Sequence, residues 1–413
     1  MRGMDELKSP GNILVLTYWN YRDALVQTYT IPYLRMIRRH QKPEALIYLL
    51  TLEKDHQFAS TREGEIVKCQ LLEEGIQWVP SKYTSFGISA LLGWIPLIFK
   101  LIRVVRTQNI KVLHAFATPA GSAGYILSVL TGTPLVLDSF EPHAEAMIEN
   151  GTWRRNSLAF QILLKLERWQ ARRASVVIAT TTGMLQYAQD KYGFCPPHHF
   201  VKPACVDLNQ FLKPAIKDSS MLNAWGWQDK IVCVYAGKLG GIYYDKEVFD
   251  FLKAGFEFWG DRLRFLFLTN QSRQEVMELC RVSDFDFSLI HMEFVPHAEV
   301  SKYLALADFA LTPVKPVPTK RYCTPIKDGE YWAMGLPVVI PSQISDDSEI
   351  IDKERIGAVL KDSSKLSYNQ AIRSIDRLLQ IPKDELYAKI RQVAVKYRSY
   401  DIAEVVYGKL YGS

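Results

Sequence analysis

The chain has 413 residues, more than one ordinary hydrophobic core organises, so two domains of roughly 200 residues each are expected. Apolar residues make up 48% of it and charged residues 23%, which excludes a disordered chain and indicates a well-packed globular protein. The net charge of +6 fits an anionic substrate or an anionic membrane surface, and a solvated surface with a slight excess of Lys and Arg explains it equally well. Spread over this length, the charge gives no reason to expect a nucleic-acid partner.

The cysteines and the N-terminus indicate a cytoplasmic protein. Six cysteines show no metal-type spacing and lie mostly in apolar contexts, which predicts reduced thiols. Residues 1–12 contain acids and a proline where an export signal needs an apolar core. No uninterrupted apolar run reaches transmembrane length, so any membrane contact would be peripheral, at the inner face of the cell membrane.

Strands alternate with helices along the first half of the chain, which predicts a parallel, doubly wound α/β sheet. The predicted strands are 12–18, 45–50, 76–79, 111–115, 134–138 and 176–180. The predicted helices are 23–40, 63–74, 86–106, 118–130, 157–173 and 183–192.

The most apolar of these helices is 86–106, which we expect Pro96 to break. Lys100, Arg103 and Arg106 form a basic edge at its end. An apolar body with a basic edge is typical of a helix that lies on an anionic membrane surface. A core helix of the sheet is the competing interpretation, and the sequence leaves both open.

A polar cluster follows the fifth predicted strand. It contains Asp138, Glu141, His143 and Glu145. Ligands of open α/β sheets bind outside the carboxyl ends of the strands, so this cluster is expected to face a binding cleft. A charged helix start is the alternative explanation of the same residues.

The second half repeats the alternation after a linker predicted at 213–229, a stretch with Pro, Asp and Ser residues. The predicted strands are 230–236, 265–269, 290–295, 308–313, 337–340 and 357–360. The predicted helices are 246–258, 273–280, 297–307, 326–334 and three more to the end, the last being 401–411. The predicted domains are therefore 1–212 and 230–395, and a C-terminal segment, 396–413, is expected to cross back to the first.

A glycine-rich loop, GKLGG at 237–241, follows the first strand of the second half. The small residues Gly237, Gly240 and Gly241 let backbone N–H groups approach a phosphate, and Lys238 can pair with its charge. By itself this loop is a weak signal, because it is neither a Walker loop nor the dinucleotide fingerprint.

The segment 319–341, TKRYCTPIKDGEYWAMGLPVVIP, combines a helix start, a helix end and a buried strand. Thr324 is predicted as the N-cap and Pro325 as the first helical residue, followed by a helix from Ile326 that ends at Gly335.

Lys327 and Glu330 lie three residues apart and therefore share one face of this helix. The free N–H groups and the positive dipole end of the first turn favour a phosphate. A cation for phosphate beside a carboxylate for sugar hydroxyls predicts a nucleotide-sugar site.

TPIKDGEYWAMGLPVV resembles the donor-site signature of the retaining GT-B glycosyltransferases of glycosyltransferase family four (glycosyl transferases group one), roughly Pro-x-Lys-x-x-Glu-Tyr-x-Ala-x-Gly-x-Pro-Val. The Tyr-x-Gly and Leu-Gly pattern around 235–241 and the segment FVKPACVDLNQF at 200–211 resemble further motifs of this family. The resemblance spans residues 110–360. It implies two Rossmann-like, doubly wound domains that face a central cleft.

The resemblance implies transfer of a sugar from a nucleoside-diphosphate sugar to an acceptor hydroxyl, with retained anomeric configuration, in the assembly of polysaccharides or lipid-linked glycans. Lys238, Lys327 and the loop amides would stabilise the leaving diphosphate, and such electrostatics is usually the largest catalytic contribution. In the family the residue at Glu330 binds the nucleotide ribose. The implied donor-binding residues are Gly237, Lys238, Gly240, Gly241, Pro325, Ile326, Lys327 and Glu330.

The sequence departs from the family pattern at three places. Tyr322 stands where many members carry a glutamate that touches the donor sugar. Phe116 replaces the second histidine of a His-x-His motif that starts at His114, so the role of a histidine beside the sugar must fall to His143 or be absent. A glycine-rich loop after the first strand is replaced by 19–22.

Trp19 and Tyr21 in this replaced loop could stack on an acceptor sugar, and a packed loop is the alternative. The implied acceptor-side residues are Trp19, Tyr21, Asp138, Glu141 and His143. No metal is expected, because Asp284-Phe285-Asp286 reads as a turn outside the context that a metal-binding Asp-x-Asp motif needs, and no Cys/His set has zinc spacing.

Two other functions stay open. A GT-B-like binding or scaffold subunit without turnover would explain Tyr322 and Phe116. Another GT-B enzyme, such as a sugar-nucleotide epimerase or a phosphorylase, is the second alternative. A phosphorylase would need a cofactor lysine or a phosphate-binding arginine cluster, and we identify neither in the sequence.

Overall fold

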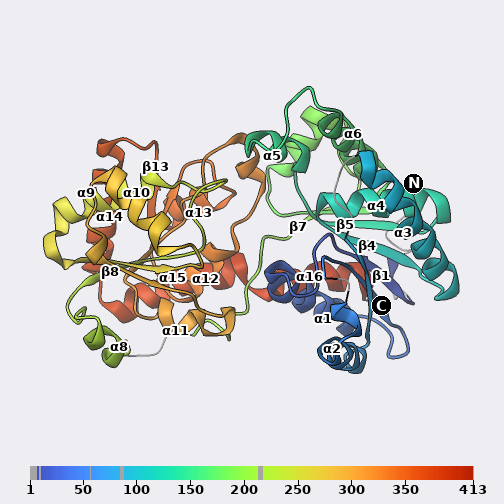
Figure 1. Ribbon diagram of the computed structural model, residues 1–413, viewed down its shortest axis with the longest axis horizontal. Coiled ribbons are helices and arrows are strands. Elements are labelled where there is room, and N and C mark those ends of the chain that lie inside the picture. The colour runs from blue at the N-terminus through green and yellow to red at the C-terminus, as the bar shows by residue number, and fades with distance from the viewer. Residues whose placement is uncertain (1–6, 9–10, 56, 84–87, 213–216, 413) are drawn as a thin grey trace. The chain divides into compact units, whose positions relative to one another are not determined.

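The computed structural model describes residues 7–8, 11–55, 57–83, 88–212 and 217–412 (Figure 1). The chain divides into two compact units. Unit 1 comprises Met1–Pro203 and Asp401–Ser413, and unit 2 comprises Ala204–Tyr400. The last helix of the chain thus belongs to the same unit as the first strand.

Unit 1 contains a sheet of seven parallel strands in the order β3-β2-β1-β4-β5-β6-β7. Its strands are β1 Ile13–Leu16, β2 Ile47–Glu53, β3 Ile76–Lys82, β4 Val112–Phe116, β5 Leu135–Phe140, β6 Val176–Ala179 and β7 His199–Val201. The six predicted strands are confirmed. β7 was missed because its three residues form no apolar run and lie partly exposed at the edge of the sheet.

Helices cover both faces of this sheet, as a doubly wound topology requires. They are α1 Ile31–Arg39, α2 Arg62–Glu73, α3 Ile88–Thr107, α4 Ala117–Thr131, α5 His143–Glu149, α6 Leu158–Arg173, α7 Met184–Tyr187 and α16 Tyr400–Tyr411. Two π-helical segments, Val26–Thr30 and Ala188–Tyr192, extend α1 and α7. α5 starts at His143 with Glu145 in its first turn, which confirms the alternative explanation of this polar cluster as a charged helix start.

α3 runs without interruption through Pro96, so the predicted break of this helix is wrong. A proline in a helix interior removes one hydrogen bond and usually bends the helix. Pro96 lies on the exposed side of α3, where water can satisfy the carbonyl group that loses its donor. The helix can therefore continue to Thr107.

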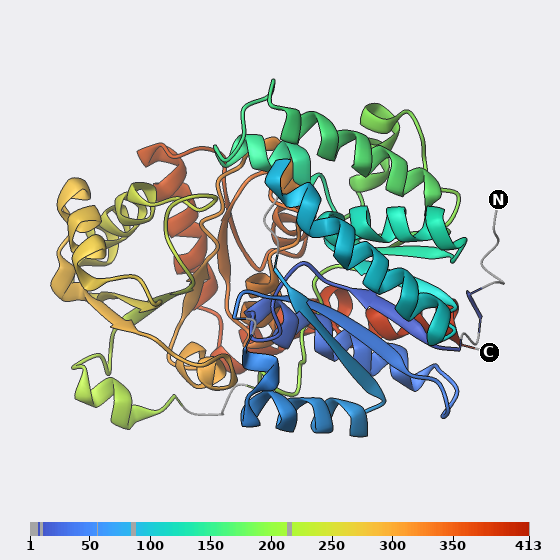
Figure 2. The same cartoon turned by 45° about the vertical axis from the view of Figure 1, so that its right-hand side comes forward.

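A buried charge network attaches α16 to the sheet of unit 1. The Asp138 carboxylate lies 3.2 Å from Lys202 Nζ and 3.1 Å from His114 Nε2, and it accepts a hydrogen bond of 2.7 Å from Tyr407 in α16. Burial by itself would raise the pKa of Asp138, but Lys202 and His114 hold it well below its usual range. Figure 2 shows α16, in red, beside the blue N-terminal strands.

Unit 2 contains a second parallel sheet, of six strands in the order β10-β9-β8-β11-β12-β13. The strands are β8 Ile231–Ala236, β9 Leu263–Leu268, β10 Ile290–Glu293, β11 Phe309–Leu311, β12 Val338–Pro341 and β13 Gly357–Leu360, which confirms the six predicted ones. The helices are α8 Ser219–Ala224, α9 Lys246–Trp259, α10 Arg273–Ser283, α11 Val300–Leu304, α12 Ile326–Ala333, α13 Asp347–Glu354, α14 Lys365–Leu379 and α15 Lys383–Arg398. α8 and α13 were not predicted.

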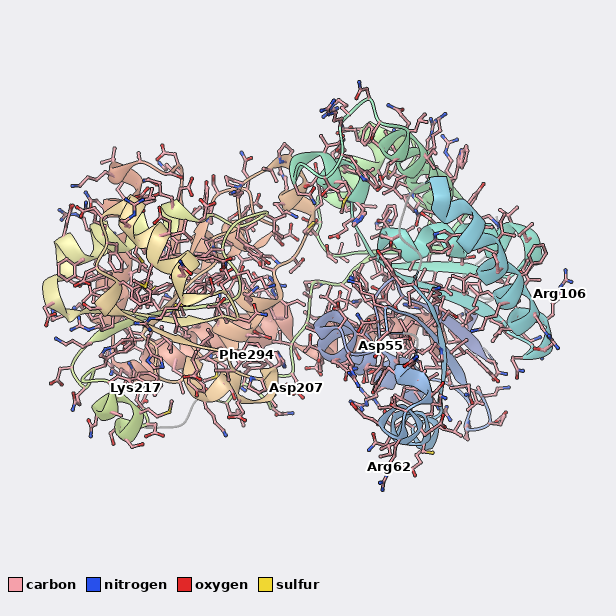
Figure 3. All side chains as sticks on the ribbon, in the orientation of Figure 1. Asp55, Arg62, Arg106, Asp207, Lys217 and Phe294 are labelled. Atoms are coloured by element: carbon pink, nitrogen blue, oxygen red, sulfur yellow. The ribbon has the colours of Figure 1, made fainter. Side chains whose placement is uncertain are left out.

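The stretch predicted as a linker is described from Lys217 onward and packs into unit 2. α8 lies in it, and Leu222 and Trp227 are buried in the hydrophobic core of this unit. Lys217, labelled in Figure 3, forms an ion pair of 2.7 Å with Asp308. The predicted end of the first domain at residue 212 and the predicted start of the second at residue 230 remain predictions.

All six cysteines are free thiols, and three of them are buried. Within the described ranges, no helix is both long enough and apolar enough to cross a membrane.

Replacing Asp138 by Asn would leave the buried Lys202 ammonium without its counter-charge. We expect the free energy of unfolding to fall by about 3–5 kcal/mol in urea denaturation followed by circular dichroism. The double variant Asp138→Asn/Lys202→Met should recover much of this loss, because it removes both charges. Glu278→Gln, which breaks an exposed pair with Arg281, serves as the control and should change stability by less than about 1 kcal/mol. An Asp138→Asn variant as stable as the control would contradict the network.

Candidate functional site

The donor-site candidate is built around α12 in unit 2. The helix begins at Ile326, as predicted, but Pro325 is extended at φ −67° and ψ 120° and occupies the N-cap position instead of the first helical position. The prediction that Thr324 is the N-cap is therefore wrong. Pro325 has no side chain that can cap the first turn, and the positive end of the helix dipole there favours an anion. Gly335, at φ +68°, terminates the helix as predicted.

Two buried side chains fix α12 against the sheet. Asp328 accepts a hydrogen bond from Thr312, which follows β11. Tyr331 Oη accepts a hydrogen bond of 3.0 Å from the amide of Ala236, the last residue of β8. The start of α12 therefore lies at the carboxyl ends of the two central strands, where open α/β sheets bind ligands.

A second buried carboxyl group lies beside Asp328. Asp347 forms an ion pair with Arg398, whose Nη1 also donates to the Ala204 carbonyl at 3.1 Å. Burial raises the pKa of both Asp347 and Asp328, and Arg398 offsets only part of this effect.

Lys327 lies against the glycine-rich loop. A Cβ atom added at Gly237 would come within 2.9 Å of Lys327 Cε and 2.7 Å of Tyr235 Oη, and φ of Gly237 is +154°. Lys327 Nζ lies 5.1 Å from the centre of the Tyr243 ring. Only glycine permits this close approach, so the structure brings together the two phosphate-binding elements predicted from the sequence.

The loop offers fewer free amides than predicted. Three of them already donate within unit 2: Gly237 to the Leu268 carbonyl at 2.9 Å, Leu239 to Gln271 Oε1 at 2.6 Å, and Gly240 to the Tyr244 carbonyl at 3.4 Å. Among the described residues, none accepts a hydrogen bond from the amides of Lys238 and Gly241. Those two amides and the exposed Lys238 side chain are the part of the loop that can meet a phosphate.

Glu330 contacts a histidine that sequence reasoning missed. His297 Nε2 lies 2.8 Å from Glu330 Oε1, and this hydrogen bond raises the pKa of His297. The Glu330 side chain is 7% exposed. His297 was predicted only as the first residue of a helix, although it follows the carboxyl end of β10 closely, as the other site residues follow their strands. That position was the available signal.

In unit 1 the loop with Trp19 and Tyr21 is packed. The Tyr21 ring lies 5.0 Å from that of Trp78, and the Tyr21 amide donates to Glu53 Oε1 at 2.9 Å. The Trp19 carbonyl accepts from the Leu52 amide at 3.0 Å. Both aromatic side chains are half-buried, so each keeps part of its surface for a ligand.

Asp138 does not reach the surface, and its expected acceptor-side role is replaced by the structural network described above. His114 is likewise buried in β4, where it contacts Asp138. Glu141 and His143 are half-buried at the start of α5. Nearby, Ala117 and Ser139 adopt φ +65° and +53°, a strained conformation that is common at functional sites.

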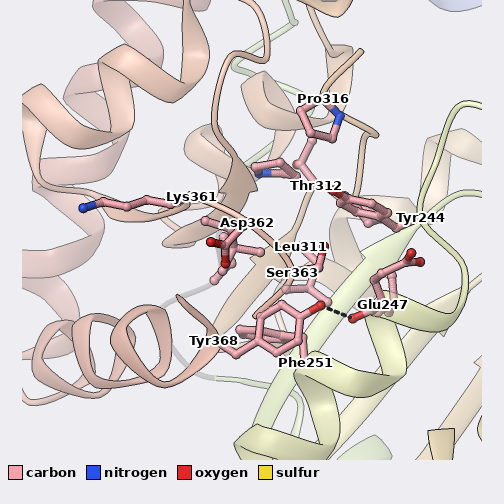
Figure 4. Close-up of a pocket in the computed structure, with 15 residues that line it drawn as sticks. Tyr244, Glu247, Phe251, Leu311, Thr312, Pro316, Lys361, Asp362, Ser363 and Tyr368 are labelled. Carbon is pink, nitrogen blue, oxygen red and sulfur yellow. Dashed lines mark hydrogen bonds between the residues drawn. The ribbon is translucent and has the colours of Figure 1, made fainter. Parts of the chain in front are cut away.

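A small pocket lies beyond the carboxyl ends of β11, β12 and β13 (Figure 4). Its volume of about 30 Å³ accommodates one or two water molecules, not a nucleotide, and neither Lys327 nor Glu330 lines it. Over the described part of the chain, no group of three His, Cys, Asp or Glu side chains is arranged to hold a metal ion. Asp284 terminates α10 and Asp286 caps the next turn, as predicted for this motif.

Comparison with known proteins identifies this fold. Residues 60–204 match the family described as the Glycosyl transferase 4-like domain. Solved structures align over nearly the whole chain: HepE of Anabaena in complex with UDP (15% identity, 97% of this chain and 99% of that one, TM-score 0.69), sucrose-phosphate synthase of Thermosynechococcus elongatus (12%, 97% and 98%, 0.71), and WaaG, a glycosyltransferase involved in lipopolysaccharide biosynthesis (13%, 97% and 100%, 0.69). The chain has the GT-B fold. No curated protein matches the sequence.

These findings confirm the resemblance to the GT-B glycosyltransferases. The resemblance was first recognised in the segment 319–341, whereas the family match lies entirely in the first half of the chain. Two separate parts of the sequence therefore indicate the same group of proteins. At identities of 12–15% the solved structures establish the fold alone.

A buried carboxyl group supports the start of α5. Glu167 of α6 accepts hydrogen bonds from the Ala144 amide at 2.7 Å and from Tyr192 Oη at 3.3 Å. Burial raises its pKa to about 8. Between its ordinary pKa of 4.5 and about 8, the folded state retains a proton that the unfolded state has released. The free energy of unfolding therefore falls as the pH rises through this interval.

Glu167→Gln should remove this pH dependence. We expect the variant to gain stability over the wild type by at most about 1.4 kcal/mol per pH unit between these two values, and then to keep a constant advantage. Urea denaturation at several pH values measures it. Glu278→Gln, a change at an exposed carboxylate paired with Arg281, is the control. Parallel curves for Glu167→Gln and the wild type would show that Glu167 is not the titrating group.

Proposed function

We propose that the protein is a retaining glycosyltransferase of the hexosyl-transferring type, which moves a sugar from a nucleoside-diphosphate sugar to a hydroxyl of a glycan or a lipid-linked acceptor. The observation that carries the proposal is the juxtaposition of Lys327 with the loop at Gly237, one turn before Glu330 on the same helix. A diphosphate needs the cation and the free amides, and a ribose needs the carboxylate. The α12 region supplies both within one unit.

The leaving diphosphate gains negative charge as the glycosidic bond breaks. Lys327, Lys238 and the first turn of α12 would stabilise that charge, with Pro325 and Ile326 at the helix start. No protein nucleophile and no metal enter this proposal, because the leaving phosphate can take the acceptor proton on the same face of the sugar. HepE was solved with UDP and with UDP-glucose, which makes uracil the first base to test here.

The proposed acceptor contacts belong to unit 1. Glu141 and His143, at the start of α5, are the proposed polar contacts, with His143 as the histidine beside the sugar. The exposed parts of Trp19 and Tyr21 would stack on an acceptor ring. Phe116, which had suggested a scaffold without turnover, is a buried core residue whose ring stacks on Tyr33, so the scaffold alternative now rests on Tyr322.

A thermal-shift panel with UDP, GDP, ADP, CMP and dTDP tests the donor site. A ligand at a hundred times its dissociation constant stabilises the folded state by about 2.7 kcal/mol, which gives a measurable shift. We expect one diphosphate to raise the unfolding temperature, and Lys327→Ala and Glu330→Gln to abolish the shift. Lys365→Ala, which removes a cation paired with Glu257 at the surface, is the control. If no nucleotide stabilises the protein, the function proposed here is wrong.

A lipid-linked acceptor fits the outer helical layer of unit 1, in which α4 packs between α3 and α6. Among the side chains that the structure describes, eight large apolar ones are exposed on this layer: Ile95 and Phe99 on α3, Ile126, Val129 and Leu130 on α4, and Leu158, Ile162 and Trp169 on α6. Trp169 stacks on Tyr125 of α4 at 6.1 Å, which joins two of the helices through aromatic rings. Aromatic side chains of this kind are favoured at the boundary between lipid and water.

The charges of this layer have one sign. The three helices carry three Lys or Arg residues on α3 and four on α6, and their one acid, Glu167, is buried. Arg106 extends from the end of α3 (Figure 3). Exposed apolar side chains interspersed with cations fit an anionic bilayer surface. The peripheral contact proposed for residues 86–106 would therefore extend over α4 and α6.

Co-sedimentation with vesicles tests this contact. We expect binding to vesicles that contain phosphatidylglycerol and little binding to phosphatidylcholine alone. Arg168→Glu/Arg172→Glu should weaken binding more than tenfold, since each cation near such a surface contributes about 1 kcal/mol. Arg281→Glu/Lys302→Glu in unit 2 changes the net charge equally and should bind as the wild type does. Equal binding to both lipids, or equal loss in both variants, would contradict the assigned face.

A further inference from the structure

Within the described chain, the Glu330 carboxylate has one hydrogen-bonding partner, His297. The bond joins His297 Nε2 to Glu330 Oε1 at 2.8 Å, and it leaves Oε2 without a protein partner. The side chain of Glu330 is 7% exposed and that of His297 is 38% exposed. One carboxylate oxygen is therefore held by the protein, and the other is free for a ligand.

The His297 imidazole also contacts Phe211 and Gln210. The ring of Phe211, which is buried, lies edge-on at 5.8 Å from the His297 ring. Gln210 Nε2 lies 3.4 Å from His297 Nδ1 and 3.5 Å from its carbonyl oxygen. A donor on Nδ1 favours the tautomer whose proton is on Nε2, the nitrogen that faces Glu330.

The segment that contains Gln210 and Phe211 is hydrogen-bonded to α12 through Arg391. Arg391 Nη1 donates to the Phe211 carbonyl at 2.8 Å and to the Ala333 carbonyl at 2.6 Å. Gly329 of α12 also lies so close to Val206 that an added Cβ would come within 2.9 Å of its side chain. The orientation of His297 toward Glu330 is therefore set by the same contacts that place α12.

We propose that His297 is a positioning residue for ribose recognition: it holds the Glu330 carboxylate so that Oε2 accepts hydrogen bonds from the ribose hydroxyl groups. The inference rests on the function proposed above, because it assigns the ligand of Glu330 to a nucleotide ribose. His297 itself need not touch the nucleotide. It adds a residue from the β10–α11 connection to a site otherwise formed by α12 and the glycine-rich loop.

The physical reason is the environment of Glu330. A nearly buried carboxylate one turn from a bound diphosphate experiences repulsion from the ligand and has lost most of its hydration. An N–H donor on one oxygen compensates for that loss and selects one side-chain rotamer. Without it, the carboxylate could turn toward solvent or toward Lys327, which lies on the same face of the helix. Binding of the diphosphate would persist, but recognition of the ribose would weaken.

Isothermal titration calorimetry with UDP and with 2′,3′-dideoxy-UDP separates these two effects. The ratio of the two dissociation constants reports the contribution of the ribose hydroxyl groups. In the wild type we expect a preference for UDP of about tenfold or more, the range of hydrogen bonds to charged groups. In His297→Ala the ratio should fall to less than about threefold, while the affinity for dideoxy-UDP stays within about twofold of the wild type.

Two variants make the test specific. His297→Gln keeps an N–H donor and should restore part of the ratio, which a general loss of structure would not allow. His291→Gln is the matched control, because His291 lies in β10, stacks on Trp225 at 3.9 Å and contacts Glu293. The control should keep the ratio of the wild type.

The outcomes distinguish the two proposals. If UDP does not bind the wild type, the experiment uses the nucleotide that raises the unfolding temperature, together with the 2′,3′-dideoxy analogue of that nucleotide. If no nucleotide raises the unfolding temperature, the proposed function and this inference both fail. If the wild type binds both ligands equally, Glu330 does not recognise the ribose hydroxyl groups. A clear preference that is unchanged in His297→Ala would overturn the role of His297 and leave the proposed function intact.

Discussion

A charge that is removed from water must find a partner, and this constraint organises the carboxyl ends of the strands in both units. In unit 1 the Asp138 carboxylate forms an ion pair with Lys202. In unit 2 Arg398 forms an ion pair with Asp347, beside a second buried carboxyl group. Both networks lie directly behind the loops that carry the candidate site residues. Separating either pair would leave an uncompensated buried charge, so the backbone next to it has few alternative positions. The preorganised sites depend on these two networks more than on any exposed interaction.

The regular elements were predictable because parallel strands buried on both faces give short apolar runs between turn residues. β13 was predicted to the residue, and Gly335 marked the end of α12 because the chain there needs a positive φ. The N-cap of α12 was placed one residue too early, since Thr324 followed by Pro325 has the form of a cap. Helix α13 was missed because it is short and charged, and α5 was anticipated only as a charged helix start after the fifth strand. The contact between His297 and Glu330 was missed because the two residues are 33 positions apart along the chain, and only the position of His297 after β10 pointed to it.

The candidate residues of the two units are supported in different ways. In unit 2 the cation, the glycine-rich loop and the carboxylate converge on one helix start, and strands and buried hydrogen bonds hold them in place. In unit 1 the loop at Tyr21 packs on Trp78, and the start of α5 is hydrogen-bonded to the buried Glu167 carboxyl group. Each unit therefore fixes its own candidate residues through contacts within that unit.

The position of α16 also bears on how the chain is synthesised. Tyr407 and Tyr411 are buried in unit 1, and they contact Asp138 and His114 near the middle of its sheet. The first unit therefore lacks part of its interior until α16 has been synthesised, although nearly all of its sequence precedes that of unit 2. Unit 2 is continuous from Ala204 to Tyr400 and has all its residues before α16 is complete. The unit whose synthesis begins first is thus the one whose interior is completed second.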